Sequence, residues 1–218
     1  NPVSKISGNS AEFKETEHFF LKLSMVQNEL SKWIETKKGW RPHVINWAKS
    51  FVSDGLQDRA ITRDLDWGIK IPVDDLGPGK KIYVWFEAVI GYLSASKEWA
   101  QINNKPDEWE NWWLNPDAET FYFIGKDNVP FHAVIWPSIL LGYENLNLPT
   151  NVPANQYILV KGEKASASRG VGKTLDEYLD EWNPDALRYA LASALPEQSD
   201  SEISESEMIR RNNEELVA

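Results

Sequence analysis

Hydrophobic residues recur along the chain at two spacings, and each spacing predicts a different element. Val26, Leu30 and Ile34 lie four positions apart, which predicts a helix with one apolar face. Ser24 and Gln27 have the spacing of a capping box, in which the two side chains close the first turn of a helix. The chain is therefore predicted to enter its first long helix at Ser24.

The same reasoning places the remaining elements. Further helices are predicted from Pro42 to Gly55 and at 88–100, 107–114, 128–141, 175–182 and 186–195. Runs rich in β-branched and aromatic residues predict strands at 15–23, 81–86, 120–124 and 156–161. Pro137 is expected to kink or end its helix, and the acidic residues 197–207 predict an exposed loop before a final helix. Strands separated by helices predict an α/β fold with parallel pairing.

Composition limits the classes of protein that this chain can be. Its 218 residues suffice for one large domain or somewhat more, and 42% of them are apolar. A net charge of −10 disfavours DNA binding, although a local basic patch remains compatible with RNA. No apolar run is long enough for a membrane span and no targeting signal opens the chain, so a cytoplasmic protein is predicted. The start reads like the middle of a longer polypeptide.

Metal binding by this chain is not expected. There is no cysteine, which excludes disulfides and a cysteine-based zinc site within these residues. His18, His43 and His132 lie far apart and lack the spacing of metal ligands. No metal site and no zinc site are therefore predicted in this chain.

Two junctions carry candidate chemistry. A predicted strand ends at Gly125 and a helix opens behind Asp127, and ligands bind at such carboxyl ends of strands in open α/β sheets. About thirty residues later, a loop rich in Gly, Ser and Lys begins at Lys161, and loops of this kind suit phosphate groups. Together the two junctions predict a nucleotide-dependent enzyme.

Four segments resemble those of methionyl-tRNA synthetases, in the order of that family. They are TRDLDWGIKIP (62–72), YVWFEAVIGYLSA (83–95), FIGKDNVPFHAVIWP (123–137) and EKASASRG (163–170). NPDALRYAL (183–191) extends the resemblance, which covers nearly the whole chain. The combination is specific, because related class I synthetases share the loop but are not expected to share the Trp and Tyr of the second segment.

The resemblance implies an architecture. The fold class would be α/β, with the second half of a Rossmann-type parallel sheet and flanking helices. Residues 1–23 would form the return strand from a connective insert, and 24–160 the second half of the catalytic domain. Residues 161–200 would form a stem-contact segment with the signature loop, and 201–218 the start of the helical anticodon-binding domain. The first half of the catalytic domain, with its His-Ile-Gly-His type motif, is not in this sequence.

The resemblance also implies a methionine pocket formed by Trp85, Val89, Tyr92 and His132. A flat aromatic wall suits a thioether, because sulfur–aromatic contacts are favourable by about 0.3–1.5 kcal/mol. His132 would line the pocket and donate to the substrate. From the residues alone, core packing of the two aromatics and a structural role for the histidine are the alternatives.

An adenylate site is implied at Gly125, Asp127, Lys164, Ser166 and Ser168. Asp127 would contact the ribose, although a role as helix N-cap is equally open. Lys164 would be the catalytic lysine of the loop.

The loop departs from the family pattern Lys-Met-Ser-Lys-Ser, because Ala165 and Ala167 stand where Met and the second Lys are expected. That second lysine would stabilise charge on the departing pyrophosphate, which alanine does not. The loop is therefore predicted to be impaired.

Arg63 and Asp64 precede a tight turn, and the resemblance implies a structural role or a role at the tRNA 3′ end. The alternative is a surface ion pair between them, worth about 0–1 kcal/mol.

The predicted function is that of a methionine–tRNA ligase fragment. Its partners would be methionine, ATP with Mg, tRNA(Met) and the missing half of the catalytic domain, and the chain alone would be inactive. The alternative is a non-catalytic tRNA- or protein-binding fragment on the same fold, which the loop alanines favour.

Overall fold

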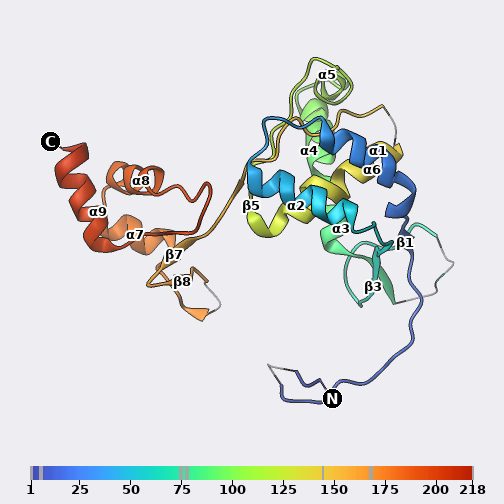
Figure 1. The fold of residues 1–218 in the computed structure, drawn as a ribbon, viewed down its shortest axis with the longest axis horizontal. Coiled ribbons are helices and arrows are strands. Elements are labelled where there is room, and N and C mark those ends of the chain that lie inside the picture. The colour runs from blue at the N-terminus through green and yellow to red at the C-terminus, as the bar shows by residue number, and fades with distance from the viewer. Residues whose placement is uncertain are drawn as a thin grey trace.

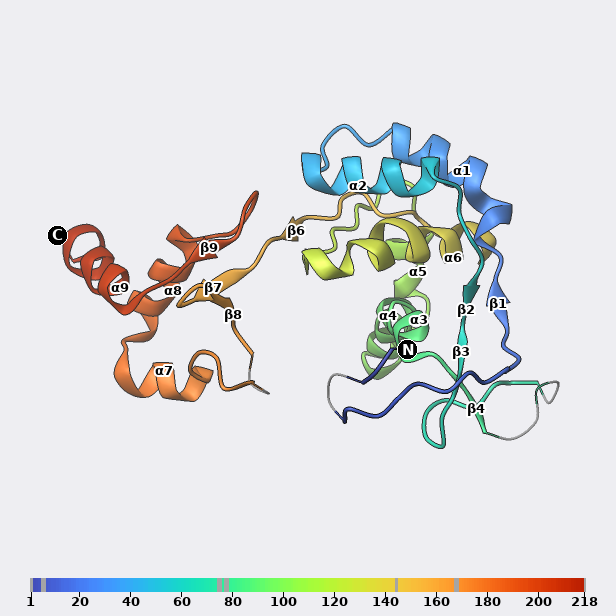
Figure 2. The same cartoon turned by 60° about the horizontal axis from the view of Figure 1, so that its bottom comes forward.

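The computed structural model describes residues 2–4, 7–73, 76, 79–143, 145–166 and 169–217. They form two lobes joined by an extended segment, which is visible at the centre of Figure 1 and again in Figure 2. The first lobe runs to β6 (Ala154–Asn155), and the second begins at β7 (Ile158–Val160). The mixed α/β composition predicted from the sequence is confirmed, whereas the Rossmann-type half and the domain boundaries stay predictions.

A three-helix layer forms the main core of the first lobe. Its helices are α1 (Leu23–Glu35), α2 (Pro42–Ser53) and α6 (Trp136–Tyr143). The side chains of Leu30 and Val44 are completely buried between the helices. The two helices predicted at the start of the chain are thus confirmed, and burial of their apolar faces holds them together.

The start of α1 differs from the prediction. Its N-cap is Lys22, and no side chain closes the first turn. Instead the Ser24 hydroxyl donates to Asp58 Oδ1 at 2.8 Å, and Gln27 Oε1 accepts from the Leu56 N–H at 2.8 Å. The predicted capping box is therefore wrong, because both of its polar side chains fasten the loop after α2 onto α1.

The strands are short, and they pair in several small ladders. β1 (Phe20–Leu21) and β2 (Arg59–Ala60) are antiparallel, as are β3 (Thr62–Asp64) and β4 (Lys80–Ile82). β5 (Ile124–Gly125) and β6 are parallel. Parallel pairing is thus confirmed for β5 with β6 and wrong for the earlier strands. Only two residues of the strand predicted at 15–23 form a ladder, and Leu23 already belongs to α1.

The strand predicted at 81–86 ends early. β4 stops at Ile82, and residues 84–88 form the short helix α3 (Val84–Ala88), followed by α4 (Gly91–Ile102) and α5 (Glu108–Trp113). β-propensity reflects packing on a pleated surface. Here no neighbouring strand lies beside Trp85, whose ring instead contacts Phe131. The prediction failed because the aromatic content was read as a strand signal.

The long helix predicted at 128–141 is built from three hydrogen-bonding patterns. A 3₁₀ turn at Lys126–Asn128 precedes a π-helical segment at Phe131–Ile135, and α6 follows. Pro137 lies inside this continuous helical stretch, shortly after the π-helical segment. Of the two expected effects of this proline, ending the helix is wrong, since α6 continues to Tyr143, and the irregular π-helical hydrogen bonding lies just before it.

The second lobe packs helices against a three-stranded sheet. β7 pairs antiparallel with β8 (Glu163–Lys164) and parallel with β9 (Ser201–Glu202). The helices are α7 (Leu175–Glu181), α8 (Pro184–Ser193) and α9 (Glu205–Arg211), with a π-helical segment at Asn212–Leu216. The helices predicted at 175–182 and 186–195 are confirmed. The loop predicted at 197–207 is wrong in part, because β9 pairs along the edge of β7 despite its polar sequence.

Candidate functional site

Four predicted methionine-binding residues line one cavity of about 380 Å³ in the first lobe. Trp85 comes from α3 and Val89 from the turn after it, while Tyr92 lies on α4 and His132 on the π-helical segment. The complete lining is Trp85, Ala88, Val89, Tyr92, Phe123, Ile124, Gly125, Asn128, Phe131 and His132. The structure thus brings together side chains that are up to 47 positions apart in the sequence, counting from Trp85 to His132.

The cavity wall is aromatic and partly open. The rings of Trp85 and Phe131 lie 5.6 Å apart between centroids, and those of Tyr92 and Tyr122 lie 5.1 Å apart. Trp85 is 49% exposed and Phe123 is 79% exposed. The alternative of simple core packing for Trp85 does not fit such exposure, because a core tryptophan buries most of its surface.

His132 is buried, and both of its ring nitrogens have hydrogen-bond partners. Nδ1 lies 3.0 Å from the carbonyl oxygen of Asn128, which only accepts, so Nδ1 carries the hydrogen. Nε2 of the neutral ring then accepts from the Tyr92 hydroxyl at 2.8 Å. In this arrangement neither His132 nor the Tyr92 hydroxyl has a hydrogen left to donate to a ligand.

Burial lowers the pKa of His132 from its ordinary value of 6.5, and the Asn128 carbonyl offsets this only in part. The unfolded chain therefore binds this proton more readily than the folded chain. The stability that neutral His132 contributes is complete above about pH 6.5 and is lost as the pH falls.

We expect the free energy of unfolding to fall between pH 7 and pH 5, by at most about 1.4 kcal/mol per pH unit from this group. A smaller fall is expected in a His132→Gln variant, whose side chain does not titrate. Urea denaturation at several pH values measures both chains, which share every other titratable group. Identical pH dependence in the two chains would contradict a neutral, buried His132.

The residues of the predicted adenylate site approach one another at the boundary between the lobes. Lys164 Nζ lies 3.0 Å from Asp127 Oδ2. Tyr157 and Lys164 together lower the pKa of Asp127 by stabilising its carboxylate. Asp127 lies within the 3₁₀ turn and not before it, so the predicted alternative of an N-cap is wrong: Gly125 is the N-cap of that turn.

The structure describes Gly125 and Ser166 of the predicted adenylate site, but not every residue of the loop. A side chain at Gly125 would meet no atom within 4 Å, which leaves room for a ligand at the end of β5. Ser166 forms an isolated antiparallel bridge with Val171. Ala167 and Ser168 lie outside the described residues, and their roles stay predictions.

Arg63 and Asp64 are neighbours in sequence but have separate partners, so the alternative of a surface ion pair between them is wrong. Arg63 donates to the carbonyl oxygens of Ala60 and Thr62, and its guanidinium lies 3.8 Å from the centre of the Tyr83 ring. The Lys80 ammonium binds Asp64 and lowers its pKa, with a further hydrogen bond from Thr16.

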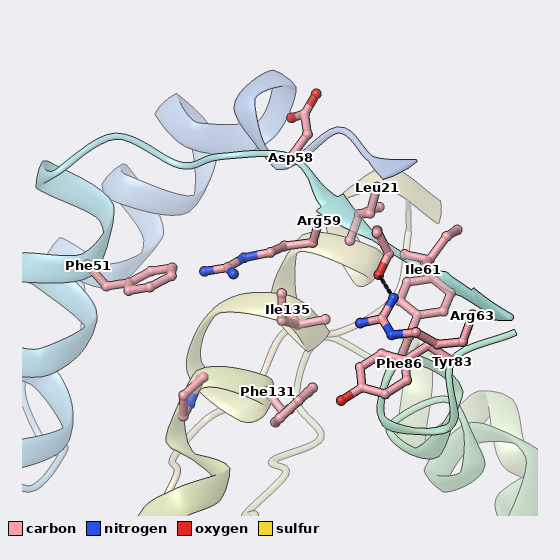
Figure 3. Close-up of a pocket in the computed structure, with 12 residues that line it drawn as sticks. Leu21, Phe51, Asp58, Arg59, Ile61, Arg63, Tyr83, Phe86, Phe131 and Ile135 are labelled. Atoms are coloured by element: carbon pink, nitrogen blue, oxygen red, sulfur yellow. Dashed lines mark hydrogen bonds between the residues drawn. The ribbon is translucent and has the colours of Figure 1, made fainter. Parts of the chain in front are cut away.

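Arg63 lines a second cavity, of about 510 Å³, which lies between β2, α2, α3 and the π-helical segment (Figure 3). Arg59 extends across this cavity toward Phe51, at 5.7 Å from the ring centre. Phe131 lines both cavities, so its side chain forms part of the wall between them.

Sequence reasoning missed several residues of the site, three of them aromatic. Phe131 and Phe123 line the cavity of about 380 Å³, and their only signal was their position close to His132 and Gly125. Tyr157 contacts Lys164, and nothing in the sequence distinguishes it from an ordinary strand residue. These contacts depend on tertiary packing, which spacing does not reveal.

Within the described ranges, no group of three or more His, Asp or Glu side chains is placed to hold a metal ion. In the same part of the chain, no helix has the length and apolar character needed to cross a membrane.

The sequence of the chain matches a known family. A family model described as "tRNA synthetases class I (M)" matches residues 1–218. The chain therefore belongs to the class I tRNA synthetases. Within that class, it belongs to the methionyl-tRNA synthetase family, whose members match it along its full length.

Two relatives define the extent of the match. A methionine–tRNA ligase of Thermoplasma volcanium is 48% identical over 217 residues, which is 100% of this chain and 40% of the relative. One of Dehalococcoides mccartyi is 52% identical over 207 residues, 95% of this chain and 37% of the relative. The chain thus spans about two fifths of the length of the relatives it matches.

Solved structures agree with the fold. Mycobacterium tuberculosis methionyl-tRNA synthetase in complex with methionyl-adenylate has a TM-score of 0.77 and 26% identity, covering 99% of this chain and 41% of that chain. The unliganded form of the same enzyme has a TM-score of 0.74 at 24% identity, a likeness of fold alone.

Proposed function

We propose that this chain forms the methionine-binding side of a methionine–tRNA ligase and works together with the remaining three fifths of the family's polypeptide. The observation that supports this most strongly is the single cavity that gathers Trp85, Val89, Tyr92 and His132 beside the Asp127–Lys164 pair. A family relationship that covers the whole chain supports it as well.

The proposed reaction has two steps. A carboxylate oxygen of methionine attacks the α-phosphorus of magnesium-bound ATP, and pyrophosphate leaves with the bonding electrons. A ribose hydroxyl at the 3′ end of tRNA(Met) then attacks the carbonyl carbon of the adenylate, loses its proton, and AMP leaves. In both steps the chain's own residues position the reactants, because holding two groups together removes an entropic barrier.

Each residue has a role in this proposal. The rings of Trp85 and Tyr92 contact the thioether side chain, and Val89 and His132 complete the pocket. Asp127 accepts hydrogen bonds from the ribose hydroxyls of the nucleotide. Lys164 faces the phosphates, with Ser166 and Ser168 in the same loop, and Gly125 allows close approach of the adenylate. Arg63 and Asp64 serve the structure near the second cavity or the tRNA 3′ end.

The chain alone is expected to be inactive, since half of the nucleotide site is proposed to come from the rest of the polypeptide. The test is a chimera in which this chain replaces the matching segment of the Thermoplasma volcanium relative. Methionine-dependent exchange of pyrophosphate into ATP by the chimera, absent from the chain alone, is the expected result. A folded chimera that binds tRNA but neither methionine nor ATP would support the non-catalytic alternative.

Replacing Trp85 by alanine in this chimera is expected to weaken methionine binding by about 2 kcal/mol or more, roughly 30-fold in Kd, because an aromatic wall is lost. ATP binding should change far less. Calorimetric titration of each ligand measures both effects.

Trp99→Ala is the matched control for this change. Trp99 is 43% exposed, similar to Trp85, but it lies outside the cavity. Equal weakening of methionine and ATP by Trp85→Ala would show that Trp85 only supports the fold.

A further inference from the structure

Tyr157 occupies the boundary between the two lobes, directly before β7. The ammonium nitrogens of Lys126 and Lys164 lie 4.1 Å and 3.9 Å from the centre of its ring. Its backbone N–H donates to Asp200 Oδ1 at 2.8 Å, which fixes the position of the residue. One aromatic ring therefore contacts a lysine from each lobe.

Two ion pairs near this ring join the lobes. In one pair the lysine belongs to the first lobe, and in the other it belongs to the second. Lys126 of the first lobe binds Asp200 of the second at 2.7 Å, and Asp127 of the first lobe binds Lys164 of the second at 3.0 Å. Both pairs are partly exposed, and exposed ion pairs are weak because water competes for them. The ring gives both lysines an additional cation–π contact, and water competes less for this contact than for an exposed ion pair.

Hydrogen bonding to the side chains of Tyr157 and Asp127 raises the pKa of the Lys164 ammonium, and the face of the Tyr157 ring adds a separate cation contact at 3.9 Å. The two partners differ in what a ligand would do to them. If Asp127 binds the ribose of a nucleotide, as the proposed function holds, its carboxylate turns away from Lys164. The ring of Tyr157 has no such competing partner.

We infer that Tyr157 is a positioning residue for the loop lysine. Its ring holds Lys164 beside Asp127 before a ligand binds. It keeps Lys164 at the proposed nucleotide site after the carboxylate of Asp127 has bound the ligand. The second part of this inference rests on the proposed function, and the first part does not. Tyr157 itself touches no reacting atom. Its effect is to keep the Lys164 ammonium in place while Asp127 exchanges its ion pair with Lys164 for a contact with the ligand.

The test measures how readily each lysine of the 218-residue chain is acetylated by acetic anhydride at pH 8, with mass spectrometry of each site. Lys22, an exposed lysine far from Lys164 in the sequence, is the internal reference. Tyr157→Leu removes the ring and is expected to raise the rate at Lys164 about two- to fivefold, as for loss of an exposed cation–π contact. Lys126 should respond in the same direction.

Tyr157→Phe keeps the ring and is expected to preserve most of the protection. Tyr143→Leu makes the same change at an exposed tyrosine, 66% accessible, and should leave Lys164 unchanged. Lys173, whose ammonium is bound by Glu181 and Glu205, should be unaffected in all variants. An unchanged rate at Lys164 in Tyr157→Leu, or equal effects of the Leu and Phe variants, would overturn the inference. Lys173 also reports on folding, because unfolding of the Leu variant would speed acetylation there as well, so only a rise at Lys164 and Lys126 with Lys173 unchanged supports the inference.

Adenosine separates this inference from the proposed function. At millimolar concentration it is expected to raise acetylation of Lys164 in the chimera with the Thermoplasma volcanium relative, where the rest of the nucleotide site is present, because the ribose takes Asp127, and to raise it further in the Tyr157→Leu chimera. In Asp127→Asn, adenosine should have no effect. An adenosine-independent rate in every chain, together with the expected Tyr157→Leu effect, would refute the proposed ribose contact while the positioning role of Tyr157 stands.

Discussion

Trp136→Ala is expected to lower the free energy of unfolding by about 3–5 kcal/mol. Trp136 is 1% exposed, and it is among the largest completely buried side chains of the described residues. Its indole N–H donates to the Tyr122 hydroxyl at 2.9 Å, and its ring meets that of Trp113 edge to face at 5.8 Å. The alanine would leave a cavity and an unpaired hydroxyl in the cluster directly behind the proposed methionine pocket.

Urea denaturation followed by far-ultraviolet circular dichroism measures this loss. Trp112→Ala is the matched control, because Trp112 is 36% exposed and its ring contacts only another exposed ring, that of Trp99. Trp112→Ala should lower the free energy of unfolding by less than about 1 kcal/mol, as substitutions at exposed positions usually do. A loss below about 1 kcal/mol for Trp136→Ala would mean that this cluster does not support the fold as described.

Ala167→Lys is expected to raise the rate of adenylate formation by about 10²–10³ in the chimera with the Thermoplasma volcanium relative, by analogy with a single donor in an oxyanion site. The introduced ammonium would meet charge that develops on the departing pyrophosphate. Interactions made only in the transition state act on turnover and not on substrate binding. Methionine affinity should therefore stay nearly constant.

Single-turnover kinetics of adenylate formation measures this effect, and Ala165→Met is the control. The methionine restores only packing of the loop and should change the rate far less. An unchanged rate in Ala167→Lys, with methionine and ATP both bound, would contradict the proposed role of the loop and favour the non-catalytic alternative.

The sequence predicted the helices of the chain better than its strands. The apolar stripe through Leu30 and Ile34 set the buried face of α1 because helical spacing alone determines which side chains share a face. The run at 81–86 failed because its aromatic residues face a cavity and not a sheet. The polar residues of β9 gave no strand signal, since their pairing depends on the edge that β7 presents.

The site was predicted in part for a similar reason. Trp85, Tyr92 and His132 were found through motifs, and the structure places them around one cavity. Motifs do not reveal hydrogen-bond partners, so the mutual bond of Tyr92 and His132 was not foreseen. Tyr157 was missed because its contacts with Lys126 and Lys164 depend on tertiary packing at the boundary between the lobes.

The closed hydrogen-bond chain from Tyr92 through His132 to Asn128 has a consequence for selectivity among amino acids. Its polar atoms satisfy one another whether or not a sulfur atom is present. An analogue with a methylene in place of sulfur therefore leaves no buried group unpaired on this side of the pocket. Apolar walls distinguish such near-isosteres only by contact, which is typically worth about 1–3 kcal/mol. If this cavity binds methionine as proposed, strict rejection of an unbranched hydrocarbon side chain would then depend on atoms outside this hydrogen-bond chain.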